Sequence, residues 1–183
     1  MKKLLHKQIL DWKGTKHDLE LYESDDLSDL GFTNQCQAVP FIDDEHIVIF
    51  KHIDGYYGLP GGTVEEGEKF EDTLKREVME ESGCKVLDYG LIGYFKDIEI
   101  PNNKIKYQLR YWAHVKPISK PKDPDSKALD IEIVKLEDEV TGNDLTETEK
   151  DMSFQYVLCV LCGLIAIRVG LEAIKKIRER RSS

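Results

Sequence analysis

Three glutamates stand close together in the middle of the chain, in the segment REVMEESG at residues 76–83. Glu80 and Glu81 follow Glu77 by three and four residues, so a helix would bring the three side chains near one another. Like charges at that spacing repel unless a cation lies between them. Carboxylate oxygens are the ligands that Mg²⁺ prefers. The spacing therefore predicts a site for a divalent ion, Mg²⁺ or Mn²⁺.

A helix with one buried face would position these glutamates. Its predicted apolar stripe recurs every four residues and comprises Phe70, Leu74 and Val78. At about 100° per residue, Glu81 falls close to this stripe, Glu77 lies at its edge and Glu80 sits a little further round. Carboxylates that flank a buried stripe are partly desolvated, and ionised groups there need a counter-charge. The periodicity thus favours a cation site over a solvated acidic face.

Residues on either side of the glutamates are expected to support them. The helix is predicted to start near Glu68, and Arg76 follows this glutamate by about two turns. We expect the Arg76 guanidinium to tether Glu68 and to brace the loop before the helix. Gly83 is expected to end the helix, as glycine commonly does at the C′ position.

The loop before the helix favours a close approach of the backbone to a ligand. It has the sequence YGLPGG at residues 57–62, in which Pro60 is rigid while Gly61 and Gly62 are permissive. A backbone carbonyl in this loop, that of Gly61, is a candidate metal ligand. Gly61 and Gly62 are also candidate substrate contacts.

Together, GLPGGTVEEGE and REVMEESG resemble the signature of the Nudix hydrolase family. That signature is Gly-x5-Glu-x7-Arg-Glu-U-x-Glu-Glu-x-Gly-U, where U is apolar, and every defined position from Gly62 to Cys84 is filled. Tyr57 stands where the family often carries a tryptophan, which makes it a candidate substrate contact. The resemblance implies an α+β fold, an α/β/α sandwich with a mixed central sheet. It also implies hydrolysis of a phosphoanhydride bond in a nucleoside diphosphate linked to another group, X.

The resemblance further implies roles for the signature residues. Glu77, Glu80 and Glu81 would hold the metal together with the Gly61 carbonyl, while Glu77 and Glu80 would take part in catalysis. Glu68 and Arg76 would shape the catalytic loop. The base that takes a proton from water is one of these glutamates or a carboxylate outside the signature. The outside candidates near predicted strand ends are Asp97, Glu99, Asp130 and Glu132.

The substrate and the activity have three interpretations. A nucleoside triphosphate or an oxidised nucleotide is the leading expectation. ADP-ribose, another dinucleotide or a nucleotide sugar is the alternative; Pro101, past the signature, faintly resembles a mark of that branch but is better explained as a turn proline. A nucleotide-sensing module without turnover is the third interpretation, and the intact glutamates argue against it.

Composition indicates one compact domain over residues 1–183. The chain is 40% hydrophobic and 33% charged, which is ordinary for a soluble protein with a single core. Its net charge of −9 argues against a general affinity for nucleic acid, because such binding depends on neutralising phosphates. The four cysteines form no disulfide framework, and the N-terminus has no long apolar signal segment. Cytoplasm is the expected compartment.

The remaining elements follow from hydrophobic alternation and turn signals. Residues 1–32 are expected to be a lead-in with a strand or short helix, and 116–127 a loop rich in Pro and Lys. One or two strands are expected over 85–100. Further strands are predicted over 36–42, 46–52, 105–115 and 128–136.

A C-terminal helix is predicted over residues 146–181. Its apolar run, 156–167, is shorter than the roughly 20 residues that span a bilayer, and Arg168 interrupts it. This favours core packing or a homodimer contact over a membrane anchor. Cys159 and Cys162 lie in this run without a second Cys or His pair nearby, so buried packing is favoured over a metal or redox site.

Overall fold

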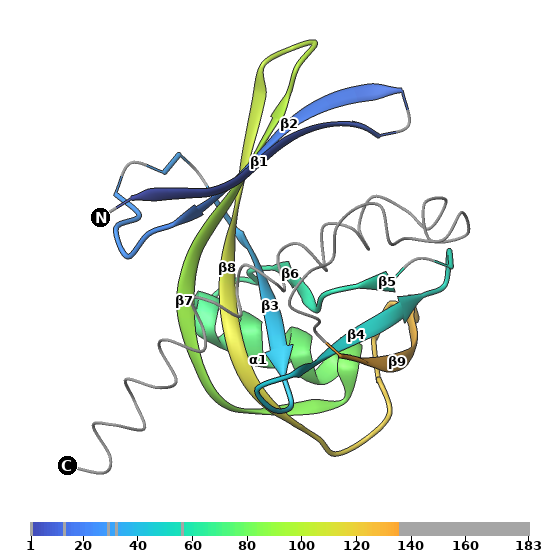
Figure 1. Cartoon of the computed structure of the whole chain (residues 1–183). Helices are drawn as coiled ribbons and strands as arrows, with labels where there is room; N and C mark the ends of the chain where they lie inside the picture. The colour runs from blue at the N-terminus through green and yellow to red at the C-terminus, as the bar shows by residue number, and fades with distance from the viewer. Residues whose placement is uncertain (1, 13, 29, 32, 56, 136–183) are drawn as a thin grey trace, which may run out of the picture.

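The structure is a computed structural model that describes residues 2–135 except 13, 29, 32 and 56. The helix predicted over 146–181 and the Cys159/Cys162 pair lie outside the described residues. The described chain forms one sheet of nine strands and one helix (Figure 1). The elements are β1 (Lys3–Trp12), β2 (Thr15–Glu23), β3 (Gln35–Phe41), β4 (His46–His52), β5 (Tyr57–Gly58), β6 (Gly61–Thr63), α1 (Phe70–Ser82), β7 (Cys84–Glu99), β8 (Lys104–Pro117) and β9 (Ala128–Lys135).

The sheet is mixed, as predicted. The strand order is β1-β2-β7-β8-β3-β4-β5, with β6 also paired to β3 and β9 to β4. Strands β3 and β8 are parallel, and the other pairs are antiparallel. The pairing of β6 with the start of β3 places the segment that leads to α1 beside an inner strand of the sheet.

Most predicted elements from residue 35 onward are confirmed to within two residues at each end. The predicted region 85–100 is a single strand, β7, and the loop expected at 57–62 contains the two short strands β5 and β6. The prediction for residues 1–32 is incomplete. Instead of one strand or a short helix, this region forms a full antiparallel hairpin, β1 with β2, whose second strand pairs with β7.

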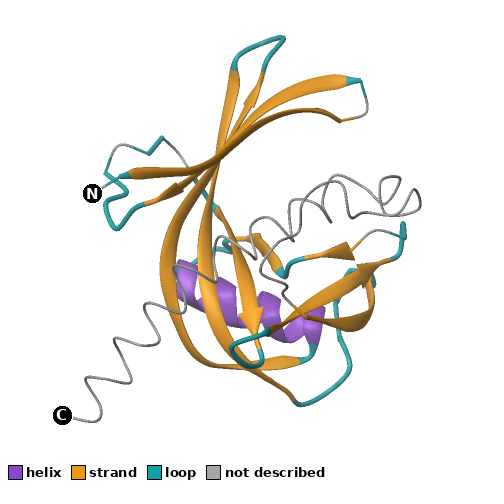
Figure 2. Cartoon of the chain, viewed as in Figure 1, coloured by secondary structure: helices purple, strands orange, loops and turns teal. Residues whose placement is uncertain are grey.

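Helix α1 packs on one face of the sheet (Figure 2). Its stripe residues Leu74 and Val78 are buried in a core cluster with alternate residues of β3 and β8, for example Cys36 and Leu109. The intervening residues of those strands lie on the opposite face, because successive side chains alternate. Those residues are also buried, and they include Val39, Phe41 and Trp112. The core therefore uses both faces of the sheet.

Candidate active site

Helix α1 begins and ends with defined caps. Lys69 is the N-cap, its backbone N–H donates to Asp72 Oδ2 at 3.3 Å, and the Asp72 N–H donates back to the Lys69 carbonyl. Gly83 ends the helix with φ +63°, in the left-handed region that glycine favours. The predicted stop at Gly83 is confirmed. The start is Phe70, two residues later than predicted.

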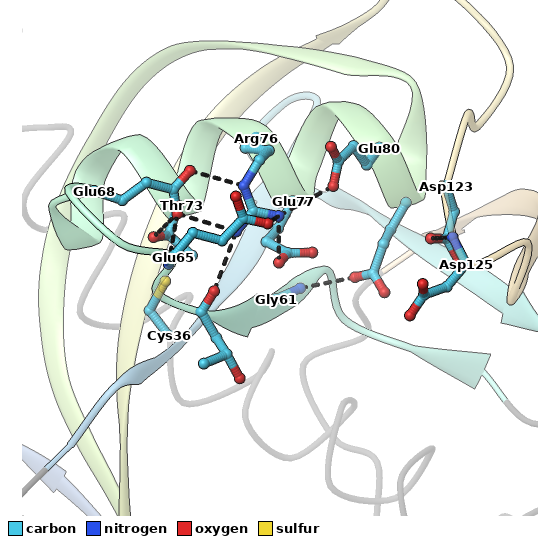
Figure 3. A network of polar contacts seen from close by, with 12 residues as sticks. Cys36, Gly61, Glu65, Glu68, Thr73, Arg76, Glu77, Glu80, Asp123 and Asp125 are labelled. Atoms are coloured by element: carbon cyan, nitrogen blue, oxygen red, sulfur yellow. Dashed lines mark hydrogen bonds and ion pairs between the residues drawn. The ribbon is translucent and has the colours of Figure 1, made fainter.

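Arg76 lies at the centre of a network of carboxylates (Figure 3). Its guanidinium donates to Glu68 from Nε at 2.8 Å and from Nη2 at 3.1 Å, which confirms the predicted tether. Nη1 donates to Glu77 Oε1 at 2.8 Å and to Glu80 Oε2 at 3.1 Å. Nη2 also reaches the carbonyl oxygen of Thr63, so the guanidinium joins the helix to β6.

Glu68 is held as a carboxylate by donors around it. The Arg76 guanidinium lowers the pKa of Glu68 to about 2, and the Glu65 N–H and the Thr73 hydroxyl add further hydrogen bonds. Thr73 itself is fully buried, so its hydroxyl fixes Glu68 against the body of the helix. The loop before α1 is therefore braced as the sequence predicts.

Glu81 turns toward β6 and is largely buried. The backbone N–H of Gly61 donates to its Oε2 at 2.8 Å. Desolvation raises the pKa of Glu81 to about 8, although the Gly61 hydrogen bond opposes this, and the negative charges of Glu77 and Asp123 add to the rise. The predicted position of Glu81 beside the apolar stripe is thus confirmed.

Glu77 lies directly over Gly62. A methyl group on Gly62 would collide with the Glu77 carboxylate, and one on Gly61 would collide with the backbone of β3. Burial raises the pKa of Glu77, whereas the hydrogen bond and charge of Arg76 lower it in part. Gly61 therefore allows β6 to lie close to β3, and Gly62 allows it to lie close to Glu77 of the helix. The predicted close approach of this loop to a ligand stays a prediction.

A family model described as the NUDIX domain matches residues 36–154, about two thirds of the chain. The chain belongs to the Nudix hydrolase family. Its fold is similar to that of a pyrophosphohydrolase of Bacillus subtilis, with a TM-score of 0.62 and 19% identity over 94% of this chain and 97% of that one. It also resembles a Nudix hydrolase from Nitrosomonas europaea, with a TM-score of 0.52 and 18% identity over 70% of this chain and 86% of that one.

The residues of this Nudix hydrolase suit a divalent metal ion. Three carboxylates gather at the helix, two of them have pKa values raised by burial, and Arg76 already supplies a cation between Glu77 and Glu80. Hard oxygen donors of this kind match Mg²⁺. Across residues 2–135, less the four gaps, no three Asp, Glu, His or Cys side chains converge tightly on one point. Arg76 bonds Oε1 of Glu77 and Oε2 of Glu80, so an ion held by these two residues would take their other oxygens or displace the guanidinium.

Asp123 is a carboxylate at this Nudix site that the sequence analysis did not single out. It lies in the loop between β8 and β9, which returns to α1: the Lys122 N–H donates to the Glu80 carbonyl at 2.8 Å, and the Ile118 N–H donates to the Gly83 carbonyl. Figure 3 shows Asp123 beyond Glu80, at the end of the helix. Its oxygens accept backbone N–H groups from residues 125, 127 and 128.

The carboxylates predicted as outside candidates lie elsewhere. Asp97 pairs with His17 at 2.7 Å, and Glu99 accepts a hydrogen bond from Asn102 at the far end of β7. Asp130 and Glu132 alternate along β9 with Ile131, which packs against the core beside α1, so their side chains project to the other face. None of the four is hydrogen-bonded to the three glutamates in the described structure.

Tyr57 lies on β5, opposite Lys51 of β4, and is half-buried.

The only described helix has 13 residues, and the part of the chain that the structure describes contains no helix long and apolar enough to cross a membrane.

Proposed function

We propose that this Nudix hydrolase cleaves a phosphoanhydride bond of a small nucleotide, with Mg²⁺ or Mn²⁺ held by Glu77, Glu80, Glu81 and the Gly61 carbonyl. A nucleoside triphosphate or an oxidised nucleotide is the preferred substrate. The supporting observation is that Glu77, Glu80 and Glu81 gather half-buried carboxylate oxygens on one side of α1 beside Gly61, more than the single Arg76 guanidinium pairs. The name of the B. subtilis relative, a pyrophosphohydrolase, agrees with this reaction type.

Each part of the site has a task in this proposal. A bound divalent ion neutralises charge on the phosphates and lowers the pKa of a water molecule. Arg76 and Glu68 keep the loop before α1 fixed, and Gly61 and Gly62 let the substrate and Glu77 approach the backbone closely. Tyr57 contributes to the substrate contact.

One of three carboxylates of the site accepts the proton of the attacking water in this proposal. Glu77 and Glu80 belong to the predicted catalytic set, and Asp123 replaces the four outside candidates. Desolvation opposes the ionisation of Asp123, but three backbone N–H groups outweigh it and lower the pKa of this carboxyl. Asp123 is therefore a charged neighbour of the site at neutral pH.

The test is a panel of nucleotides incubated with Mg²⁺, with identification of the products. Wild type is compared with Glu80→Gln and Glu81→Gln, and with Glu66→Gln, an exposed glutamate of the loop before α1, as the control. We expect turnover of nucleoside triphosphates by wild type and the control, and a loss of at least about 100-fold in the two variants. Turnover of ADP-ribose or nucleotide sugars instead would support the alternative substrates. Tight binding without turnover would support a sensing module.

The setting of the enzyme is part of the same proposal. We place it in the cytoplasm, because its four cysteines suggest no disulfide framework. With a net charge of −9, it would act on free nucleotides rather than on nucleic acid.

A further inference from the structure

The sheet extends beyond the core as a four-stranded arm, which we define as β1, β2 and residues 93–108 of β7 and β8 with their turn. In Figure 1 this arm projects away from α1. The register of its three antiparallel pairs places side chains of all four strands in straight rows across one face.

The outer row of this face carries three isoleucines and one aspartate, and the isoleucines at its two ends are exposed while the two inner residues are half-buried. It contains Ile9, Asp18, Ile98 and Ile105, which are direct partners across the strands. Ile9 is 62% exposed and Ile105 is 47% exposed. Leu4 lies on the same face, opposite Tyr22, and is 46% exposed. Four of the nine large apolar side chains that are exposed in the described residues belong to the arm, with Ile100 as the fourth. Such clustering marks a contact surface.

The next row is a charged ladder that fixes the strands. It contains Lys7, Glu20, Lys96 and Tyr107. Lys7 bonds Glu20 at 2.7 Å and Asp18 at 2.9 Å, and Lys96 bonds the other oxygen of Glu20 at 3.2 Å. The row beside the isoleucines is therefore preorganised, which reduces the entropy lost on docking.

We propose that this face of the arm binds the same face of a second copy of the chain. The charges of its two rows cancel, since Lys7 and Lys96 balance Asp18 and Glu20, whereas the chain as a whole carries −9. Two copies of a strongly acidic protein repel each other over most of their surfaces, and a patch whose charges cancel and whose ends expose isoleucines is where they can approach. A two-fold axis matches a patch to itself.

The contact is made by stacking the faces and not by joining the edges of the sheets. The register of β1 with β2 shifts between Leu4 and His6, and a bulge of this kind disfavours further pairing along an edge strand. With the row of Leu4 and Tyr22 added to these two, four strands about 4.8 Å apart and three rows about 7 Å apart give a face of only a few hundred Å². That is small compared with the roughly 800 Å² per partner of a stable interface, so the dimer is weak, with a dissociation constant in the micromolar range.

Light scattering coupled to size exclusion tests this inference on the full chain, over protein concentrations from about 1 to 200 µM. We expect the mass to rise from 21.1 kDa toward twice that value. The double variant Ile9→Lys/Ile105→Lys should weaken the dimer at least about tenfold, because it buries charge in the contact. The matched control is Ile133→Lys, which changes a 54% exposed strand isoleucine at the other edge of the sheet.

Three results would overturn the proposal: a wild-type monomer at every concentration, equal dimerisation of the double variant and wild type, or an equal effect of the control. If the dimer survives the double variant but is lost when residues 152–183 are removed, the contact lies in the C-terminal segment instead. Circular dichroism of each variant verifies the fold. Light scattering does not depend on hydrolysis, so this experiment tests the dimer independently of the proposed function.

Discussion

At the scale of single residues, Glu81 shows how burial sets the charge of the site. Desolvation raises the pKa of Glu81 to about 8, from an ordinary value of 4.5. An acid with a higher pKa in the folded chain binds more protons when folded, so the free energy of unfolding falls as the pH rises between these two values. A metal ion would remove this cost by replacing the proton.

Glu81→Gln should therefore change the pH dependence of stability. In a chelator, we expect wild type to lose stability from pH 5 to pH 8, and the variant to lose less, because its amide cannot ionise. Gln also keeps an oxygen for the Gly61 N–H. Thermal unfolding across this pH range measures the effect, with Glu66→Gln as control. Parallel curves for wild type and Glu81→Gln would show that Glu81 is not desolvated as described.

Gly62→Ala tests the close approach of the backbone to Glu77. The added methyl group collides with the Glu77 carboxylate and must displace it. A displacement of about 1 Å at a catalytic group costs on the order of 100-fold in rate, so we expect a loss of that size in kcat. The control is Gly31→Ala, where the methyl group would meet only the Tyr107 ring at an ordinary 3.4 Å. Equal activity of both variants would show that Gly62 is not needed to position Glu77.

At the scale of elements, Gly83 joins the end of α1 to the loop that carries Asp123. It has φ +63°, and a methyl group there would also collide with the Ser119 carbonyl. Gly83→Ala should lower the free energy of unfolding by more than about 2 kcal/mol, measured by urea denaturation. Gly67 has φ +84° with nothing within 4 Å, so Gly67→Ala isolates the backbone strain at about 1 kcal/mol. Similar losses at both positions would mean that the loop contact adds nothing.

The charged ladder of the arm should lose its contribution to stability at low pH. Burial opposes the ionisation of Glu20, but hydrogen bonds from Lys7, Tyr22 and Lys96 outweigh it and lower the pKa to about 2. Because this pKa is depressed in the folded chain, the ladder contributes stability above about pH 4.5 and loses it as the pH falls toward 2. Glu20→Gln should lower the free energy of unfolding by roughly 1–3 kcal/mol at pH 6 and should reduce its fall at acid pH. Urea unfolding across this pH range measures both effects. An equal fall in stability at acid pH in wild type and Glu20→Gln would show that these hydrogen bonds do not hold Glu20 ionised.

The helix and its site could be predicted because their signals are local. Apolar spacing, the glycine stop and the eight-residue separation of Glu68 and Arg76 all lie within one segment. The hairpin of β1 and β2 was only partly foreseen, because Lys7 and Glu20 look solvated in sequence yet pair across strands. The turn signal was present: Asp11 accepts the Gly14 N–H, and Gly14 has φ +83°.

Asp123 could not be predicted for a related reason. Its loop is rich in Pro and Lys, and it is brought back to α1 by hydrogen bonds from the Lys122 N–H to the Glu80 carbonyl and from the Ile118 and Ser119 N–H groups to the Gly83 carbonyl. Contacts of this kind depend on the path of the whole sheet, which no spacing in the sequence expresses. The outside carboxylates that were chosen instead follow strands, but β7 and β9 carry them away from the site.

At the scale of the whole molecule, the proposed active site and the proposed dimer contact lie at opposite ends of β7. This strand begins beside Gly83 and ends in the arm (Figure 1). Dimerisation should therefore leave the site open, and we expect the hydrolytic rate per chain to be constant from well below to well above the dissociation constant. A rate that changes with protein concentration would show that the two sites are coupled.

The most direct test of the metal site is Mn²⁺ binding, measured by electron paramagnetic resonance in the presence of a non-hydrolysable nucleoside triphosphate analogue. We predict saturable binding to wild type and to Glu66→Gln, and at least about tenfold weaker binding to Glu77→Gln and Glu80→Gln. Absence of binding to wild type, or equal binding to all four proteins, would contradict a metal site built on the glutamates of α1.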